Sequence, residues 1–283
     1  MSSYEQPAKS ILHTTGFSPT SESAFAHALA IAVNNKAKLS ILHVMRDRND
    51  DVPWHDYPGV RDTLERWGYL EPGSHQRDVN KELGIKISKA VGVGKNVVNS
   101  IVGFTDAHDF DLIVMATNEN QAMPFWSKQS VAVPVSQKTK LPTLFVPQAV
   151  PGCVSLGDGS VSLDHVLIPV GHQPDVQPAL ERIVWVMNKV GGSGAIVSLL
   201  HVGNTDRFPL ISPPEDNQFT WSKVSRAGDD VSAEIVKAAK ELNARLIVMV
   251  TEGKKDLLDA IRGDTVQQVL RKAPCPVFTI PSA

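Results

Sequence analysis

Short apolar runs alternate with longer amphipathic stretches along the whole chain. The runs at 112–115 and 246–250 are continuously apolar, as in central strands of a parallel sheet with both faces covered. The pattern predicts strands at 10–15, 38–45, 84–91, 111–116, 142–147, 165–170, 195–202, 218–225, 244–250 and 276–280. It predicts helices at 19–34, 95–108, 128–138, 175–190, 229–242 and 264–272. Strands that alternate with helices in this way indicate βαβ units and an α/β fold.

The second half of the chain repeats the first. Asp-Leu-Ile-Val-Met-Ala-Thr at 111–117 returns as Arg-Leu-Ile-Val-Met-Val-Thr at 245–251, an offset of 134 residues (111 to 245). Pro-Thr-Leu-Phe-Val-Pro at 142–147 and Pro-Val-Phe-Thr-Ile-Pro at 276–281 share that offset. Ile-Leu-His-Val at 41–44 matches Leu-Leu-His-Val at 199–202 with an offset of 158 residues (41 to 199). The first copy therefore holds about 24 extra residues.

These offsets divide the chain into two domains and a linker. We expect a first domain at 1–148 with the insertion near 49–80, a glycine-rich linker at 149–160, and a second domain at 161–283. The apolar side chains of the insertion predict that it folds over the carboxyl end of the first sheet as a lid. The alternative is that it packs against the flank of a helix. Leu64 and Trp67 are spaced to share one helical face, which suits either arrangement.

Composition narrows the class of protein. The 28 Lys and Arg residues against 30 Asp and Glu give a formal net charge of −2, which disfavours a nucleic-acid partner. No apolar stretch is long enough for a membrane span, and the first residues do not resemble a signal peptide. Two cysteines cannot form a disulfide framework, so we expect a cytoplasmic protein without membrane partners.

Five strands per copy, their spacing and the closing phrase Val269-Leu-Arg-Lys-Ala-Pro-Cys-Pro-Val-Phe-Thr-Ile-Pro281 resemble the universal stress protein family. The resemblance covers both halves. It implies two doubly wound, parallel five-stranded sheets of order 3-2-1-4-5, a pseudo-twofold tandem repeat and an intramolecular pseudodimer, with a homodimer of tandems left open. The resemblance also implies that the last strands, 143–147 and 277–281, are sheet edges that pair with each other. Ligands of such sheets bind outside the carboxyl ends of the strands, where the winding reverses.

The nucleotide motif of the family is incomplete here. Nucleotide-binding members resemble one another in an aspartate after strand one and in Gly-x2-Gly-x9-Gly-[Ser/Thr] after strand four. Gly16 and Gly171 stand where the aspartate is expected, and the first copy keeps only Ser130 of the glycine-rich motif. In the second copy Val250 replaces the first glycine, but the other two glycines keep their spacing. The candidate ligand-binding residues are Pro169, Gly171, Val202, Met249, Gly253, Gly263, Asp264 and Thr265.

Asp264 decides between two interpretations of that loop. Its carboxylate at a helix start satisfies the free amide groups as a plain cap and would repel a phosphate. The same helix start, with Gly253, Gly263 and Thr265, could instead hold the phosphates of ATP.

Other reactive residues point to no chemistry. The nine histidines lack zinc-site spacings, so we expect His13, His43 and His201 to be hydrogen-bonded within the fold. Cys275 fits a buried structural role, and no nucleophile motif occurs. The sequence therefore predicts no catalytic residue, no metal and a non-catalytic, stress-response binding or regulatory protein with a degenerate nucleotide pocket. Its partner would be a small-molecule ligand or another protein. The alternative is an ATP-binding, slowly ATP-hydrolysing protein whose only live site is in the second domain.

Overall fold

The computed structural model describes residues 9–17, 21–47, 54–117, 131–148, 150–173, 175–177, 179–180, 183–184, 187, 194–204, 207–215, 218–251 and 265–282. The chain divides into two units. The N-terminal unit comprises Gln6–Gln148 together with Val154–Val161. The C-terminal unit contains Ala149–Cys153 and Ser162–Ala283.

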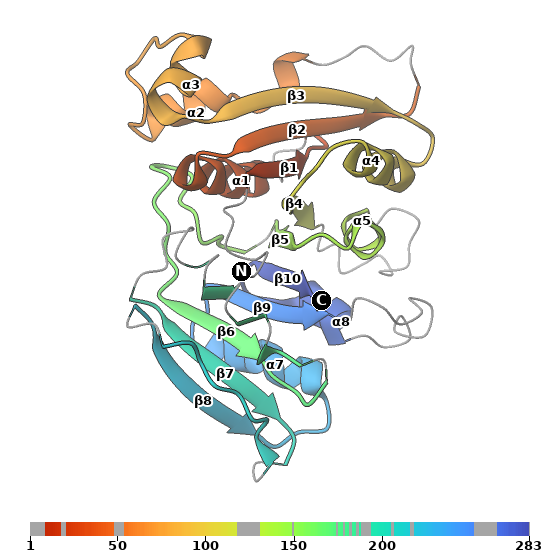
Figure 1. Ribbon diagram of the computed structural model, residues 1–283, viewed down its shortest axis with the longest axis vertical. Helices are drawn as coiled ribbons and strands as arrows, with labels where there is room; N and C mark the ends of the chain where they lie inside the picture. Colours follow the sequence, from red (N-terminus) through yellow and green to blue (C-terminus); the bar gives the residue numbers. More distant parts are fainter. Residues whose placement is uncertain are drawn as a thin grey trace. The chain divides into compact units, whose positions relative to one another are not determined.

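The N-terminal unit is built on a parallel sheet of order β3-β2-β1-β4-β5. Its strands are β1 (Ser10–Thr14), β2 (Lys38–Met45), β3 (Lys86–Val93), β4 (Leu112–Thr117) and β5 (Thr143–Pro147). The sheet winds from β1 outward to β3, returns to β4 on the other side and ends at β5 (Figure 1). The winding therefore reverses between β1 and β4, as the resemblance implied.

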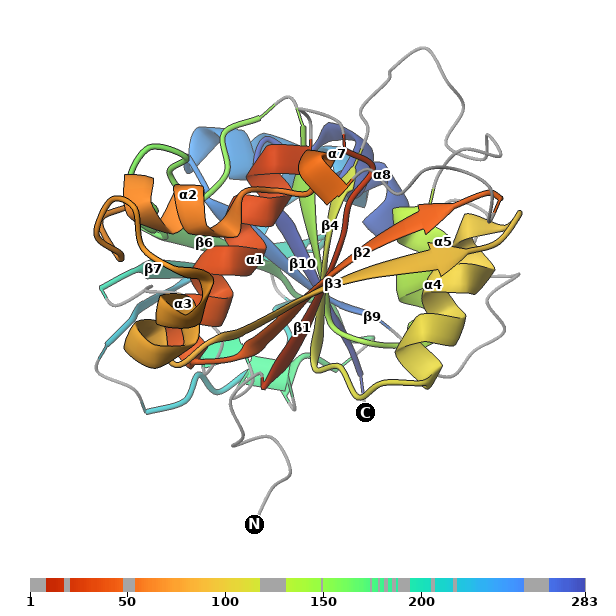
Figure 2. The same ribbon diagram turned by 90° about the horizontal axis from the view of Figure 1, so that it is seen from above.

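Helices cover both faces of this sheet. They are α1 (Glu22–Asn35), α4 (Val97–Asp106) and α5 (Ala132–Thr139). Figure 2 shows α1 on one face and both α4 and α5 on the other. Ile113 and Val114 of β4 are fully buried between these layers, which explains the continuous apolar run at 112–115.

The C-terminal unit repeats the arrangement with the order β8-β7-β6-β9-β10. Its strands are β6 (His165–Pro169), β7 (Ile196–Val202), β8 (Thr220–Arg226), β9 (Leu246–Thr251) and β10 (Val277–Pro281), and its helices include α7 (Val231–Glu241) and α8 (Thr265–Lys272). Described helical residues between 177 and 187 belong to the helix predicted at 175–190. The neighbouring strands of this unit pair in parallel, so the predicted α/β class and strand order are confirmed.

The insertion lies in the connection from β2 to β3. It contains a short 3₁₀ helix, η2 (Trp54–Asp56), followed by α2 (Val60–Arg66) and α3 (Gln76–Leu83). Both α helices lie beside α1 (Figure 2), and Arg66 of α2 forms an ion pair of 3.7 Å with Glu22 of α1. Most of the insertion therefore packs on a helix flank, while the segment around Tyr57 reaches the carboxyl end of the sheet, as described below.

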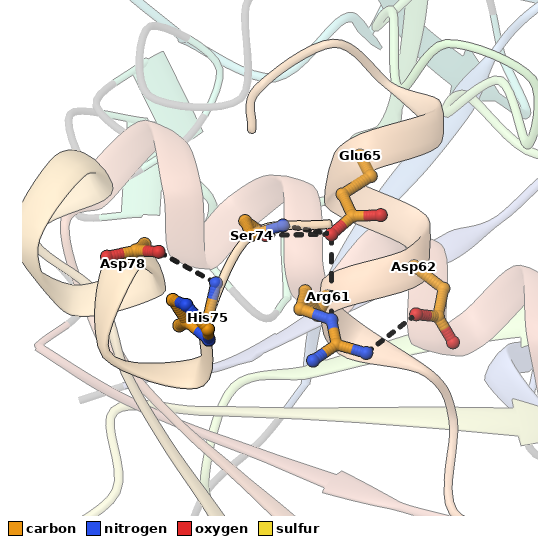
Figure 3. Close-up of polar contacts among 6 residues, drawn as sticks. All are labelled: Arg61, Asp62, Glu65, Ser74, His75 and Asp78. Carbon is orange, nitrogen blue, oxygen red and sulfur yellow. Dashed lines mark hydrogen bonds and ion pairs between the residues drawn. The ribbon is translucent and has the colours of Figure 1, made fainter. Parts of the chain in front are cut away.

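Polar contacts hold the corner between α2 and α3 (Figure 3). Glu65 accepts hydrogen bonds from both the backbone N–H and the hydroxyl of Ser74, at 3.0 and 2.8 Å, and Arg61 lies 3.5 Å from the same carboxylate oxygen. These bonds hold the pKa of Glu65 below its usual range, the Ser74 hydroxyl being the largest cause. The corner is thus ordered by side chains that face one another.

Residues 154–160 of the predicted linker belong to a small hairpin that ends at Val161. Val154 and Val161 form an antiparallel bridge, and the Ser155 N–H donates to the Ser160 carbonyl at 2.9 Å. The indole N–H of Trp67, at the end of α2, donates to the Leu156 carbonyl at 3.1 Å. Residues 154–161 therefore belong with the N-terminal unit and pack on its insertion.

Candidate functional site

Five of the eight candidate ligand-binding residues predicted for the second copy lie among the described residues. Pro169 and Val202 end the neighbouring strands β6 and β7. Met249 is a buried residue of β9, Gly171 follows β6, and Thr265 is the first residue of α8. Gly253, Gly263 and Asp264 lie outside the described residues, as does Ser130 of the first copy. The two interpretations of Asp264 therefore both stay predictions.

In the N-terminal unit, a histidine and an aromatic ring occupy the carboxyl ends of β1 and β2. His43 of β2 donates from Nδ1 to the carbonyl of Thr15, just after β1, at 2.9 Å. A carbonyl oxygen can only accept, so this bond requires a proton on Nδ1. The ring of Phe17 stacks on the imidazole with centroids 4.0 Å apart. Phe17 has a φ of 57° and donates its N–H to the Thr15 hydroxyl at 3.2 Å, which fixes the ring in place.

Tyr57 of the insertion completes this cluster. Its ring meets Phe17 edge-on at 4.9 Å, and its hydroxyl donates to the Ala90 carbonyl of β3 at 2.6 Å. The residue is 4% exposed, and burial raises the pKa of its phenol. Trp54 stacks on its ring at 5.4 Å, and the ammonium of Lys89 lies 5.4 Å from the ring centroid. The insertion was predicted to fold over this end of the sheet, and these contacts confirm that prediction for the segment around Tyr57 only.

The C-terminal unit contains a matching cluster. His201 of β7 donates from Nδ1 to the carbonyl of Val170, just after β6, at 3.2 Å. His172 and Phe208 meet its ring edge-on at 5.9 and 5.8 Å. The ammonium of Lys223 lies 5.3 Å from the Phe208 ring. We call Phe17, His43 and Tyr57 the N-terminal cluster, and His172, His201 and Phe208 the C-terminal cluster.

Strand register shows that the two clusters are equivalent. Lys89 of β3 is paired with Ile41, and Lys223 of β8 is paired with Leu199, the matching residue of the repeat. The histidines follow two residues later on β2 and β7. Tyr57 and Phe208, by contrast, come from connections of different length, with two α helices in the first and none among the described residues of the second. The fold therefore supplies the aromatic ring by two different routes.

The structure confirms the prediction that strand histidines are bonded within the fold. Besides His43 and His201, His13 donates from Nδ1 to the Val114 carbonyl at 3.1 Å. Within the described ranges, no group of three His, Cys, Asp or Glu side chains could hold a metal ion. Likewise, no described helix combines the length and apolar character needed to cross a membrane.

One hydrogen-bond chain resembles an activated nucleophile. His165 Nε2 lies 2.8 Å from the Ser198 hydroxyl, which lies 2.8 Å from that of Ser222. Ser198 is only 1% exposed, so an external substrate cannot reach its oxygen. The N-terminal unit has the matching serine pair, Ser40 and Ser88, without a histidine. The hydrogen-bonded series His165, Ser198 and Ser222 is therefore a structural contact between neighbouring strands.

Both cysteine thiols are also buried away from solvent. Neither Cys153 nor Cys275 forms a disulfide in the described part of the chain, and burial raises the pKa of each to about 12. A neutral buried thiol is a poor nucleophile. The structural role predicted for Cys275 agrees with its exposure of 2%.

Sequence reasoning missed the aromatic members of both clusters. The repeated Ile-Leu-His-Val and Leu-Leu-His-Val phrases did mark His43 and His201 as equivalent. Phe17 and His172 differ in residue type, and Tyr57 and Phe208 have no common offset. A closer look at the residue that follows Gly16 and Gly171 could have found the first pair.

Comparison with known proteins agrees with this fold. Residues 7–147 and 215–281 match the model of the Universal stress protein family. A universal stress protein from Archaeoglobus fulgidus DSM 4304 is similar in structure, with 18% identity, coverage of 98% of this chain and 97% of the other, and a TM-score of 0.60. A functionally unknown protein from Pseudomonas aeruginosa PAO1 has 17% identity, coverage of 99% and 95%, and a TM-score of 0.62. No curated protein sequence matches the chain.

Proposed function

Because the chain belongs to the universal stress protein family, we propose that it is a non-catalytic binding or regulatory protein of the stress response. Its two nucleotide-type pockets are closed by its own side chains. Two cysteines that form no disulfide in the described part of the chain favour a cytoplasmic location. The partner is a small molecule other than a nucleotide, or a regulatory protein.

The occurrence of the same histidine–aromatic cluster in both units supports this proposal. In an open α/β sheet a ligand lies against the carboxyl ends of the strands next to the reversal. There His43 binds the Thr15 carbonyl and Tyr57 binds the Ala90 carbonyl, with the Phe17 ring between their side chains. A nucleoside in that position would have to expel a buried aromatic ring and leave its hydrogen-bond partner unsatisfied.

ATP binding in the C-terminal unit is the second candidate. Its cluster has only edge-on ring contacts, with His172 at 5.9 Å from His201, whereas Phe17 stacks on His43 at 4.0 Å. The spacing of Gly253 and Gly263 in the sequence also favours this candidate. Gly171, Val250 and Asp264 oppose it, because they replace or repel parts of a nucleotide site.

Titration with ATP and Mg²⁺ tests the proposal. A ligand at 100 times its dissociation constant stabilises the native state by about 2.7 kcal/mol, which a thermal melt detects. We expect no shift for the wild type and no phosphate release. Phe208→Ala and Tyr57→Ala each remove one aromatic ring, from the C-terminal and the N-terminal cluster respectively. They serve as variants in which the corresponding site is open to a ligand. One outcome would favour the second candidate and contradict closure of both pockets. In that outcome the wild type binds ATP, Phe208→Ala strengthens the binding, and Asp264→Lys changes it.

A further inference from the structure

Helix α2 lies between two buried aromatic residues that have different neighbours. Tyr57 precedes the helix by three positions and belongs to the N-terminal cluster. Trp67 is the C-cap residue of the helix and contacts the hairpin at 154–161. Both side chains are less than a tenth exposed. One short helix thus joins the pocket to the hairpin.

The contact at Trp67 is closely fitted. Besides the bond from the indole N–H to the Leu156 carbonyl, the ring packs directly on Gly159. A Cβ at Gly159 would lie 2.5 Å from the ring, and its φ of +71° already requires glycine. The hairpin is otherwise closed on itself, because Gly159 N–H donates to the Ser155 carbonyl at 3.0 Å and Asp158 accepts from Ser160 at 3.0 Å. Trp67 therefore joins the insertion to the hairpin through a hydrogen bond and a tight ring contact.

Between its ends, α2 is held by a continuous set of backbone hydrogen bonds. The Thr63 N–H donates to the Gly59 carbonyl and the Trp67 N–H to the Thr63 carbonyl, each at 2.9 Å. Tyr69 and Leu70 donate back to the Leu64 carbonyl at 2.9 and 3.3 Å, and the Leu64 side chain is fully buried. Only Pro58 and Gly59 separate Tyr57 from this bonded segment. A displacement of Tyr57 therefore has a short and stiff path to Trp67.

We propose that α2 couples the N-terminal cluster to the linker hairpin, so that withdrawal of Tyr57 loosens the hairpin at Trp67 and Gly159. The coupling regulates the site of the proposed function and rests on that proposal, since a ligand would act by displacing Tyr57. Coupling free energies are reciprocal, so a disturbed hairpin also loosens Tyr57. The C-terminal cluster has no α2 and no such connection among the residues described there.

Hydrogen exchange of the full chain tests the coupling in both directions. Tyr57→Ala should speed exchange of the Ser155, Gly159 and Ser160 amides by at least about fivefold. Phe208→Ala is the matched control, because it removes the equivalent ring of the other cluster and should leave these amides unchanged. In the reverse direction, Gly159→Ala should speed exchange at 54–59. Gly157→Ala is its control, since a Cβ there meets only the Ser155 hydroxyl at an ordinary 3.7 Å.

Two results would overturn the proposal. The first is hairpin exchange in Tyr57→Ala that rises no more than in Phe208→Ala. The second is exchange at 54–59 that is the same in Gly159→Ala and Gly157→Ala. If circular dichroism shows that Tyr57→Ala does not fold, the comparison of the two glycine variants alone decides. ATP plays no part in these measurements, so the titration above and the exchange experiment fail independently.

Discussion

At the scale of single residues, two buried histidines make the N-terminal unit sensitive to acid. His13 of β1 and His27 of α1 are fully buried, and burial lowers the pKa of each from 6.5 to about 4. Their Nδ1 atoms are bonded to the carbonyls of Val114 and Ser23, at 3.1 and 2.6 Å. Those bonds do not compensate for the lost hydration of an imidazolium, so both rings are neutral in the folded protein at neutral pH.

The free energy of unfolding should therefore fall as pH drops from about 6.5 to about 4. In that window the unfolded chain binds protons that the folded chain does not, whereas above it both states are neutral. Between pH 7.5 and 5 the loss is about 2 kcal/mol per histidine. His13→Ile introduces the residue found at the matching position 168. It should remove about half of the combined loss from the two histidines. Urea titrations at the two pH values measure the difference, and an equal loss in variant and wild type would contradict this account.

At the scale of secondary structure, matching helices begin with matching caps. Asn96 accepts from the Asn99 N–H at the start of α4, and Asp230 accepts from the Ala233 N–H at the start of α7, both at 3.0 Å. The two positions differ by the offset of the repeat. The cap was therefore kept in both copies although the residue changed.

Asn96→Ala should cost about 1 kcal/mol of stability, because it leaves the first turn of α4 without its acceptor. Asn96→Asp keeps an acceptor and should retain most of the stability. Urea unfolding followed by circular dichroism compares the two. An alanine variant as stable as the aspartate variant would show that the cap contributes nothing.

The insertion should also contribute to the stability of the N-terminal unit. Replacing residues 50–80 with a short Gly-Ser connection removes Tyr57, Leu64, Trp67 and Leu70, all less than a tenth exposed. The loss of their buried area should lower the melting temperature by roughly 5–10 °C and increase binding of a hydrophobic dye. The full chain is the control. An unchanged melt without new dye binding would mean that the insertion adds no packing.

Most elements could be predicted because their residues are locally informative. The strand around Leu-Ile-Val-Met is apolar in both copies and falls where expected. The strand predicted at 84–91 begins instead at Lys86. Gly84, with a φ of 69°, is the C-cap of α3, a helix that was not predicted because its sequence is mostly polar. The clusters could not be predicted in full, since Tyr57 reaches His43 and Phe17 only through tertiary folding of the insertion.

At the scale of the whole molecule, the last strand of each unit is an outer strand of its own sheet order. Apolar outer strands such as β5 and β10 need cover, and we predict that they pair with each other. A protease site inserted between Val161 and Ser162 leaves the hairpin with its unit. After cleavage the halves should still elute together in size-exclusion chromatography, with the uncut chain as control. Two separate, soluble monomers would contradict the pairing.

The insertion and its docked hairpin occur once per molecule. In a protein assembled from two identical chains, any added segment appears twice and must suit both positions. Joining two copies in one gene removes that constraint, so one copy can acquire a specialised part while the other stays short. Helix α2 and Trp67 are such a part, and they belong to the N-terminal copy alone among the described residues.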